Sequence, residues 1–302
     1  MAAIVAPAQN KQISHDFSAF DALDVNFDFD VRVVESRNYS ISLNVDDALK
    51  DHVQTYVKNH TLYITLNEKT LPSDIKKLYK GRRSSRPVLE ATVYTSEPLT
   101  SIKMSGTSNI SVNSDIECRD FRLDLSESAN VSRLTVDAST VTVNAAGKSH
   151  ADMKLYADNI KINAAGSSVL ELEQDSENLE IVAGGSCEIR LEGETLNASL
   201  TASGSSNVAL AGKTGRLDVT GSGTSDISAI DLKTSECSAK LSGSCKLYEA
   251  ATETLHVDIS GNSTLIFDGD PVIDIIGVKS STLQRYSTSS SSSSPSIFNR
   301  RR

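Results

Sequence analysis

Hydrophobic and polar residues alternate along most of this chain, and the alternation is organised around a recurring glycine. This recurring glycine is found at residue 147 and then at intervals of 19, 19, 19, 19, 20 and 18 residues, up to residue 261. Positions at even distances from each glycine carry apolar or small residues, and positions at odd distances are mostly polar. The apolar residues around Gly166 illustrate this: Ile160, Ile162, Leu170 and Leu172. A period of two residues is typical of a β-strand with one buried face.

This fixed repeat predicts a solenoid, because self-similarity at a period near 20 residues is the signature of stacked coils. Each coil is expected to hold two strands that meet at the glycine, where a side chain would collide with the wall or the bend needs a positive φ. A third, more variable stretch, such as residues 173–178, closes the coil. We predict an all-β fold, a single-stranded right-handed parallel β-helix with coils of about 19 residues over residues 101–286. Nine or ten coils stacked about 4.8 Å apart would make a rod roughly 45 Å long.

Residues 17–100 are less regular but keep the alternation of strands. Apolar residues alternate from Leu23 to Val33 and again from Leu62 to Leu66. We interpret this segment as an irregular β cap at the N-terminal end of the solenoid, because stacked coils leave an open strand edge that must be covered.

One short helix is predicted inside this cap. Leu49, Val53 and Val57 are spaced four residues apart, which favours a helix over residues 46–58. Both ends of the chain are expected to be disordered. Residues 1–16 have the character of a signal-peptide remnant with a small-residue site at Ala6-Pro7-Ala8, and residues 287–302 form a serine-rich tail.

The amino-acid composition agrees with a thin core and argues against some classes of function. Aromatic residues make up only 5% of the chain and tryptophan is absent, whereas compact cores of this size usually rely on aromatic side chains. The net charge of −9 argues against a nucleic-acid partner, since phosphate binding needs a basic face. No run approaches the 18 or more apolar residues of a transmembrane helix.

The four cysteines and five histidines show no spacing that is typical of a metal or redox site. Cys187, Cys237 and Cys245 take inward positions of their coils, so we interpret them as small core residues. Cys187 and Cys245 lie three coils apart, about 14 Å at strand spacing, which is too far for a disulfide. No histidine pair has the i, i+4 spacing of a zinc site. The sequence predicts no metal and no cofactor.

Catalytic motifs are missing as well. The nucleophile motif G-x-S-x-G does not occur, and the outward acidic and basic residues of the regular coils are scattered. Glycan cleavage needs clustered carboxylates and usually an aromatic platform for the sugar ring. We therefore predict no catalytic residues and a protein that is not an enzyme. The alternative is a carbohydrate-active enzyme, a polysaccharide lyase or hydrolase, because such enzymes commonly use this fold.

One segment stands apart by its charge. Residues 73–87 carry six basic residues against Asp74, which gives a local charge of +5. The candidate ligand-binding residues are Lys76, Lys77, Lys80, Arg82, Arg83 and Arg86, and they would bind a polyanion such as an acidic glycan. The interpretation we favour is a solvated insertion that protects a sheet edge from aggregation.

Several stretches of the chain resemble a known family. They are the run from Phe17 to Val25, the alternating run from Thr61 to Leu66, and the serial Ser-Gly-Ser-Ser corners. Together they resemble the family called putative auto-transporter adhesin, head GIN domain, over roughly residues 17–286. The family is found in secreted proteins of Bacteroides-type bacteria. This resemblance implies a β-helical fold, export past the inner membrane and an adhesin-like role, and it brings no catalytic residues.

We therefore expect a non-catalytic secreted or cell-envelope protein that acts as an adhesin-like binding or scaffold module. Its expected location is the periplasm, the outer-membrane surface or the extracellular space. Its expected partner is a glycan or another envelope protein. Ice binding through threonine columns is not favoured, because the outward columns mix Ser, Lys, Asp and His.

Overall fold

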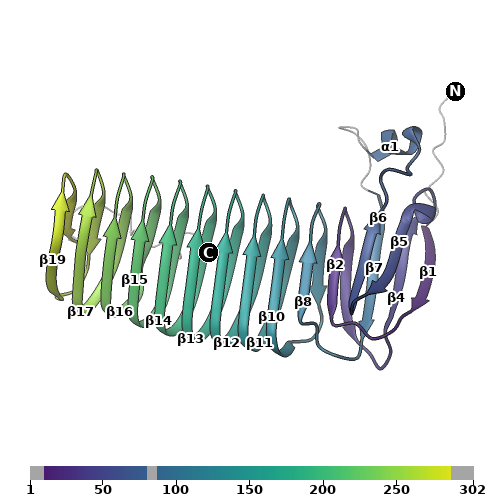
Figure 1. Ribbon diagram of the computed structural model, residues 1–302, viewed down its shortest axis with the longest axis horizontal. Coiled ribbons are helices and arrows are strands. Elements are labelled where there is room, and N and C mark those ends of the chain that lie inside the picture. The colour runs from purple at the N-terminus through teal and green to yellow at the C-terminus, as the bar shows by residue number, and fades with distance from the viewer. Residues whose placement is uncertain (1–9, 80–86, 287–302) are drawn as a thin grey trace.

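A computed structural model describes residues 10–79 and 87–286 of the 302-residue chain, and these residues form a rod with a broadened N-terminal end (Figure 1). Parallel strands wind around one axis as a β-solenoid of about ten turns, with about 19 residues in each turn. The predicted parallel β-solenoid with 19-residue coils is therefore confirmed.

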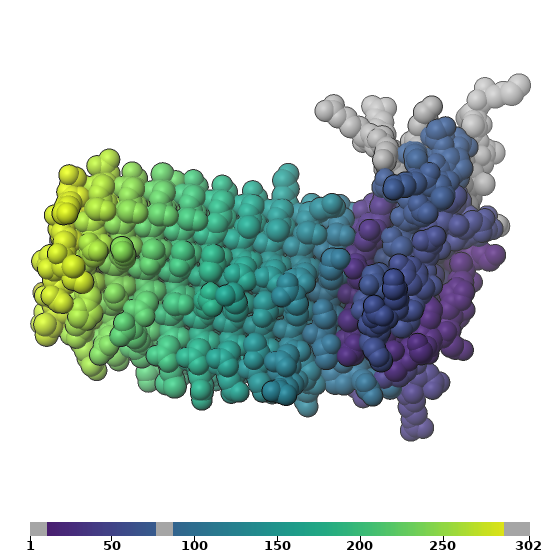
Figure 2. All heavy atoms as spheres, in the orientation of Figure 1, coloured from purple at the N-terminus to yellow at the C-terminus, as the bar shows by residue number. Residues whose placement is uncertain are grey.

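The regular coils stack in register along the rod. Their strands are β8 (Ser101–Met104), β9 (Asn109–Val112), β10 (Ile116–Leu125), β11 (Asn130–Ala145), β12 (His150–Ala164), β13 (Val169–Ala183), β14 (Glu188–Ala202), β15 (Asn207–Gly221), β16 (Asp226–Leu241), β17 (Lys246–Ser260), β18 (Thr264–Phe267), β19 (Val272–Lys279) and β20 (Thr282–Arg285). Ile160 pairs with Leu179, and Leu179 pairs with Ala198 in the next coil. Because this offset equals the sequence period, equivalent side chains line up in columns, which Figure 2 shows across the surface of the rod.

A tight corner with a glycine joins the strand segments of successive coils. Gly166 has a φ of +73°, and a Cβ at this position would lie 2.7 Å from the carbonyl oxygen of Gly147 in the preceding coil. A positive φ and a close backbone approach, the two reasons for glycine that the sequence offered as alternatives, therefore apply together. Ser167 donates its backbone N–H to the Gly147 carbonyl oxygen at 2.7 Å, so the corners are hydrogen-bonded to one another along the rod.

The core is a narrow column of side chains from the even positions. Along β13, Leu170, Leu172, Leu179 and Ile181 are all buried, and they stack on the equivalent residues of β12 and β14. Each added coil therefore buries its apolar residues against both neighbours, which is why a solenoid can be stable without a wide aromatic core.

The variable third side of the coil is also extended and paired. Residues 173–178 belong to β13, and Gln174 and Ser176 point inward. Ser176 Oγ donates to Gln174 Oε1 at 2.6 Å, and Gln174 Nε2 donates to the Glu194 carbonyl oxygen at 3.0 Å. These hydrogen bonds satisfy polar groups that would otherwise be costly to bury.

The N-terminal cap is threaded in an order that the sequence pattern does not reveal. Its strands are β1 (Asn10–Asp16), β2 (Ala22–Val25), β3 (Asp30–Glu35), β4 (Ser40–Asp46), β5 (Val53–Lys58), β6 (Thr61–Leu66) and β7 (Leu89–Thr95). β2 pairs in parallel with β6 on one side and β8 on the other, and β3 likewise lies between β7 and β9. The first coil of the chain is therefore enclosed within the stack. Parallel stacking stops where β5 pairs antiparallel with β6 and β4 pairs antiparallel with β7, and β1 then pairs antiparallel with β4.

The predicted helix over residues 46–58 is wrong. A three-residue 3₁₀ turn at Lys50–His52 leads into strand β5 instead. Val53 and Val57 lie on the half-buried side of β5, and the strand pairs with β6 along its whole length. A spacing of four residues fits both one helical turn and two strand repeats, and the cross-strand pairing decides in favour of the strand.

The α-helix of the described residues is α1 (Ser73–Tyr79), which lies in the basic segment of residues 73–87. Pro72 precedes this helix. Proline just before or at the first turn is favourable because the first backbone N–H groups have no partner within the helix. The basic residues of the segment drew attention to its charge, so this helix was not predicted from the sequence.

Among the described residues, no strand covers the C-terminal end of the rod. β19 pairs only with β17, and β20 pairs only with β18. The outer backbone edges of both strands are therefore unpaired within the part of the chain that the structure describes. β19 forms the far end of the rod in Figure 1, opposite the cap.

Candidate functional site

The strand segments that precede each glycine corner present one continuous outward surface, which we call the polar face. It consists of the residues three, five and seven positions before each corner glycine. In four central coils these are Thr140, Thr142 and Asn144; Asn159, Lys161 and Asn163; Asn178, Glu180 and Val182; and Asn197, Ser199 and Thr201. Two shallow depressions lie on this face, with volumes of about 510 and 390 Å³.

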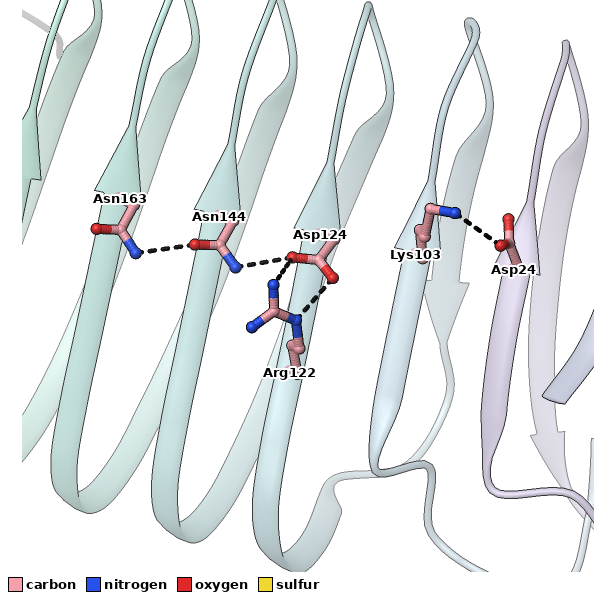
Figure 3. Close-up of polar contacts among 6 residues, drawn as sticks. All are labelled: Asp24, Lys103, Arg122, Asp124, Asn144 and Asn163. Carbon is pink, nitrogen blue, oxygen red and sulfur yellow. Dashed lines mark hydrogen bonds and ion pairs between the residues drawn. The ribbon is translucent and has the colours of Figure 1, made fainter. Parts of the chain in front are cut away.

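A ladder of polar contacts borders the larger depression (Figure 3). Arg122 donates two hydrogen bonds of 2.8 Å to the carboxylate of Asp124. Asn144 Nδ2 donates to Asp124 Oδ1 at 2.7 Å, and Asn163 Nδ2 donates to Asn144 Oδ1 at 2.8 Å. Parallel stacking places equivalent side chains about 4.8 Å apart, a spacing at which amide groups can bond from coil to coil.

The ladder continues toward the cap as an ion pair. Lys103 Nζ lies 2.9 Å from Asp24 Oδ2. This contact joins the first coil of the chain to the coil stacked next to it. The hydrogen bond and the charge of Asp24 raise the pKa of Lys103, just as those of Asp124 raise the pKa of Arg122. Both cations are therefore paired with neighbouring carboxylates.

A second ladder of three asparagines crosses the smaller depression. Asn178 Nδ2 donates to Asn159 Oδ1 at 3.2 Å, and Asn197 Nδ2 donates to Asn178 Oδ1 at 3.1 Å. In the next column Lys161 Nζ pairs with Glu180 Oε1 at 2.7 Å. Neither ladder was predicted from the sequence, although asparagine recurs at intervals of 19 residues at these positions. That recurrence at outward positions was the signal available.

The polar face is therefore suited to hydrogen bonding with neutral groups. Asn144 and Asn178, inside the ladders, each use one N–H and one acceptor site of their amides, which leaves a second N–H and a second lone pair. The ladder fixes the orientation of these remaining groups, so a ligand does not have to order them on binding. Ala146, Ala165 and Gly184 give the larger depression a floor of small residues.

The surface after each corner carries charges that neutralise one another. Lys154 Nζ lies 2.6 Å from Glu173 Oε2. Arg190 contacts Glu171 at 3.2 Å and also pairs with Glu188. Exposed pairs of this kind contribute little to stability.

The predicted basic segment is only partly within the described residues. Lys76 and Lys77 lie on α1, and Lys76 is half-buried. Lys80, Arg82, Arg83 and Arg86 lie outside the described residues. Polyanion binding by this segment therefore stays a prediction.

Three of the four cysteines lie where the sequence placed them. Cys187, Cys237 and Cys245 are buried in the core, Cys118 is half-buried, and all four are free thiols. Burial raises the pKa of each of these thiols, so they are poor nucleophiles. Within residues 10–79 and 87–286, no group of three or more His, Cys, Asp or Glu residues could hold a metal ion. No helix of these residues is long and apolar enough to cross a membrane.

A family model described as "Putative auto-transporter adhesin, head GIN domain" matches this chain over residues 19–174 and again over residues 152–271. The two matches overlap and together span the cap and nearly all regular coils. None of the curated proteins compared with the chain matches it.

Several solved structures are similar to the chain along almost their whole length. A "putative adhesin" from Parabacteroides distasonis is 17% identical, with a TM-score of 0.53, over 92% of this chain and 98% of that one. A "putative adhesin" from Parabacteroides merdae is 15% identical, with a TM-score of 0.45, over 92% and 97%. A "putative lipid binding protein" from P. distasonis is 19% identical, with a TM-score of 0.49, over 92% and 97%. Only the first of these has a TM-score above 0.5. At 17% identity it supports one conclusion, which is that the two chains share a fold.

Proposed function

The chain belongs to the family described as "Putative auto-transporter adhesin, head GIN domain", and we propose that it is an exported, non-catalytic binding module that holds a neutral, hydroxyl-rich glycan against its polar face. Family membership supports an adhesin-like role in general terms. The choice of ligand class and of surface rests on the residues of the polar face.

The pair of asparagine ladders is the observation that carries this proposal. Asn144 and Asn163 form one ladder, and Asn159, Asn178 and Asn197 form the other. Sugar hydroxyl groups both donate and accept hydrogen bonds, and so do amide groups. Rows of fixed amides at the coil spacing would contact a polymer at several points, and many weak contacts would then add up to useful affinity.

The charges of the polar face favour a neutral glycan over an acidic one. Glu180 is paired with Lys161, and Asp124 is paired with Arg122, so few cations remain to attract a polyanion. The net charge of the chain is −9, which would repel an acidic polymer at long range.

Catalysis is not supported by the same surface. A glycosidase needs one carboxyl group held in its acid form close to the substrate. Glu249 has a pKa raised to about 7 by burial, but it lies in the core with 0% of its surface exposed and cannot contact a polysaccharide. The surface carboxylates Asp124 and Glu180 are held in ion pairs.

The test is binding of the full chain to an array of neutral and acidic glycans, followed by affinity measurements on those retained. The double variant Asn163→Ala/Asn178→Ala should weaken binding at least about tenfold, because it removes amides from both ladders. Asn207→Ala is the matched control, since Asn207 is exposed on the surface after the corner. Retention of no neutral glycan, or equal binding by the double variant and the control, would contradict the proposal.

The exported location has its own test. Protease added to intact cells should remove the protein if it lies on the cell surface, and membrane integrity must be checked in parallel. Protection until the outer membrane is opened would place it in the periplasm and would point to a scaffold role. Recovery in the cytoplasmic fraction would contradict export altogether.

A further inference from the structure

The C-terminal end of the rod has the properties of an interface, and we propose that it binds the same end of a second copy of this chain through a two-fold axis. We call this surface, formed by β19 and β20, the end face. The inference does not depend on glycan binding, because it rests on other residues and on a different part of the rod.

Exposed apolar side chains are concentrated on the end face. Nine large hydrophobic residues of the described chain are exposed, and five of them lie on the eight-residue strand β19. These five are Val272, Ile273, Ile275, Ile276 and Val278, with exposed fractions of 72%, 36%, 56%, 69% and 39%. A contiguous exposed apolar patch usually marks an interaction surface.

Three of these residues are exposed because no further coil covers the core. Ile273, Ile275 and Val278 pair with Leu255, Val257 and Ile259, which are buried inward residues of the preceding coil. The exposed three therefore occupy inward positions and form the open end of the core. In any other coil of the rod these positions are covered by the next coil.

The exposure of Val272 needs another explanation. This residue pairs with Thr254, whose side chain points outward, and the outward positions one and two coils earlier hold Glu236 and Arg216. An outward position that is polar along the rod has thus become apolar at its end. Closing the core does not require this change, whereas burial of the edge against a partner would account for it.

The shape of the end face favours a second copy as its partner. The open cross-section offers two unpaired strand edges, those of β19 and β20, on different sides of one core. Another coil end with the same cross-section could pair with the edge of β19 and cover the core at once. The N-terminal end does not qualify, because its parallel stack is closed by the antiparallel strands β4 and β5. The matching surface is therefore the end face of another copy.

The sequence of β19 is also complementary to itself in an antiparallel pairing. A two-fold axis between Ile275 and Ile276 would place Ile273 opposite Val278 of the second copy, and both positions point inward. Asp274 would lie opposite Gly277 of the second copy. Both positions point outward, because an irregularity beside Ile276 shifts the alternation of inward and outward side chains by one residue. Lys279 would lie diagonal to Asp274 of the second copy, so opposite charges would meet across the contact.

A contact of this kind is closed. A two-fold interface uses the same surface on both subunits, so assembly stops at the dimer and does not continue into a fibre. The product would be one rod about twice as long, capped at both ends and carrying two polar faces. Two linked binding faces would raise the avidity for a polymeric ligand.

Sedimentation velocity of the full chain tests the proposal directly. The expected result is a dimer with roughly twice the 32.4 kDa chain mass, and it should have formed by a chain concentration of about 100 µM. Ile275→Lys should raise the dissociation constant at least tenfold, because it places a charge in the contact. Leu196→Lys is the matched control, since Leu196 is 62% exposed in the middle of the rod, and it should leave the dimer intact.

Two further measurements keep the test decisive. Val272→Lys changes an outward side chain that cannot disturb the core, so it should also weaken the dimer if Ile275→Lys happens to misfold. Removal of residues 287–302 should leave dimerisation unchanged. A monomeric full chain, a dimer insensitive to both lysine variants, growth beyond the dimer, or dimers that form only after residues 287–302 are removed would each overturn the proposal. The last result would identify that segment as what covers the end face.

Discussion

Glu249 and Cys237 lie together in the core of the solenoid, and neither has any exposed surface. Glu249 takes the inward position six residues after Gly243, which Leu172, Leu191 and Leu210 hold in earlier coils. Neither carboxyl oxygen has a hydrogen bond of good geometry. Burial raises the pKa of Glu249 to about 7, against smaller opposing effects of the Ala251 backbone and the Cys237 thiol. A carboxyl group in such surroundings is more stable in its protonated form.

The first prediction is that the protein loses stability as the pH rises from about 4.5 to about 7. The pKa of Glu249 is higher in the folded state than its ordinary value of 4.5, so the folded state holds this proton more tightly. Below the lower value both states are protonated and nothing is lost. Above the higher value the folded state must bury a charge, at a cost of about 3 kcal/mol. Urea unfolding at a series of pH values measures this change in the free energy of unfolding.

Glu249→Leu is the control for this prediction. Leucine fits the position in three earlier coils, so the variant should be more stable at pH 8 and should lack most of the decline between pH 4.5 and 7. Other carboxylates titrate in the same range, and the difference between the two proteins isolates Glu249. Parallel pH profiles for the variant and the natural sequence would show that Glu249 does not cause the decline.

The second prediction concerns the thiols. In the native protein a maleimide should label Cys118 alone, and slowly, because Cys118 is half-buried and burial raises its pKa. Cys187, Cys237 and Cys245 are buried in the core and should react only after unfolding. Mass spectrometry before and after addition of denaturant counts the labels. Cys118→Ser should take up none in the native state, and rapid labelling of a second cysteine would contradict the burial described above.

The third prediction is that Gly166→Ala destabilises the rod by about 2 kcal/mol or more. Gly166 combines a φ of +73° with backbone 2.7 Å from any added Cβ, so the variant is strained in two ways. Gly184→Ala is the matched control in the next coil, since its nearest neighbour would be the Ser203 side chain at 3.7 Å. The control should be neutral or should stabilise by about 0.5 kcal/mol, because alanine restricts the unfolded chain. Equal losses in thermal or urea unfolding would show that the corner conformation is not the cause.

The regular coils were predictable because one signal repeats. Each coil makes the same contacts with its neighbours, so the spacing of the glycines and the alternation around them determine both the strands and the inward residues, Cys187 and Cys245 included. The cap lacks such repetition. Nothing local in the run from Ala22 to Val25 indicates that β2 lies between β6 and β8, because that order depends on long-range pairing.

The candidate site was only partly accessible from sequence, for a related reason. Asn159, Asn178 and Asn197 recur at the repeat period, but hydrogen bonds between them follow only once the coils are known to stack in register. The basic residues between Lys76 and Arg86 stand out by charge alone, yet charge does not fix where they lie. Glu249 breaks the pattern of inward apolar residues, and that break was visible in the sequence once the phase of the coils was known.

The last prediction is that Glu127→Gly stabilises the protein. Glu127 occupies the corner that glycine holds in most other coils, and it has a φ of +60° with its side chain exposed. A left-handed conformation costs a residue other than glycine about 1–2 kcal/mol, while the added freedom of glycine in the unfolded chain offsets roughly 0.5–1 kcal/mol. The free energy of unfolding should therefore rise by about 0.5–1 kcal/mol. Ser128→Gly, one residue beyond the corner and without a positive φ, should lower it instead. A loss of stability in both variants would mean that the Glu127 side chain makes a contribution larger than the strain of its backbone.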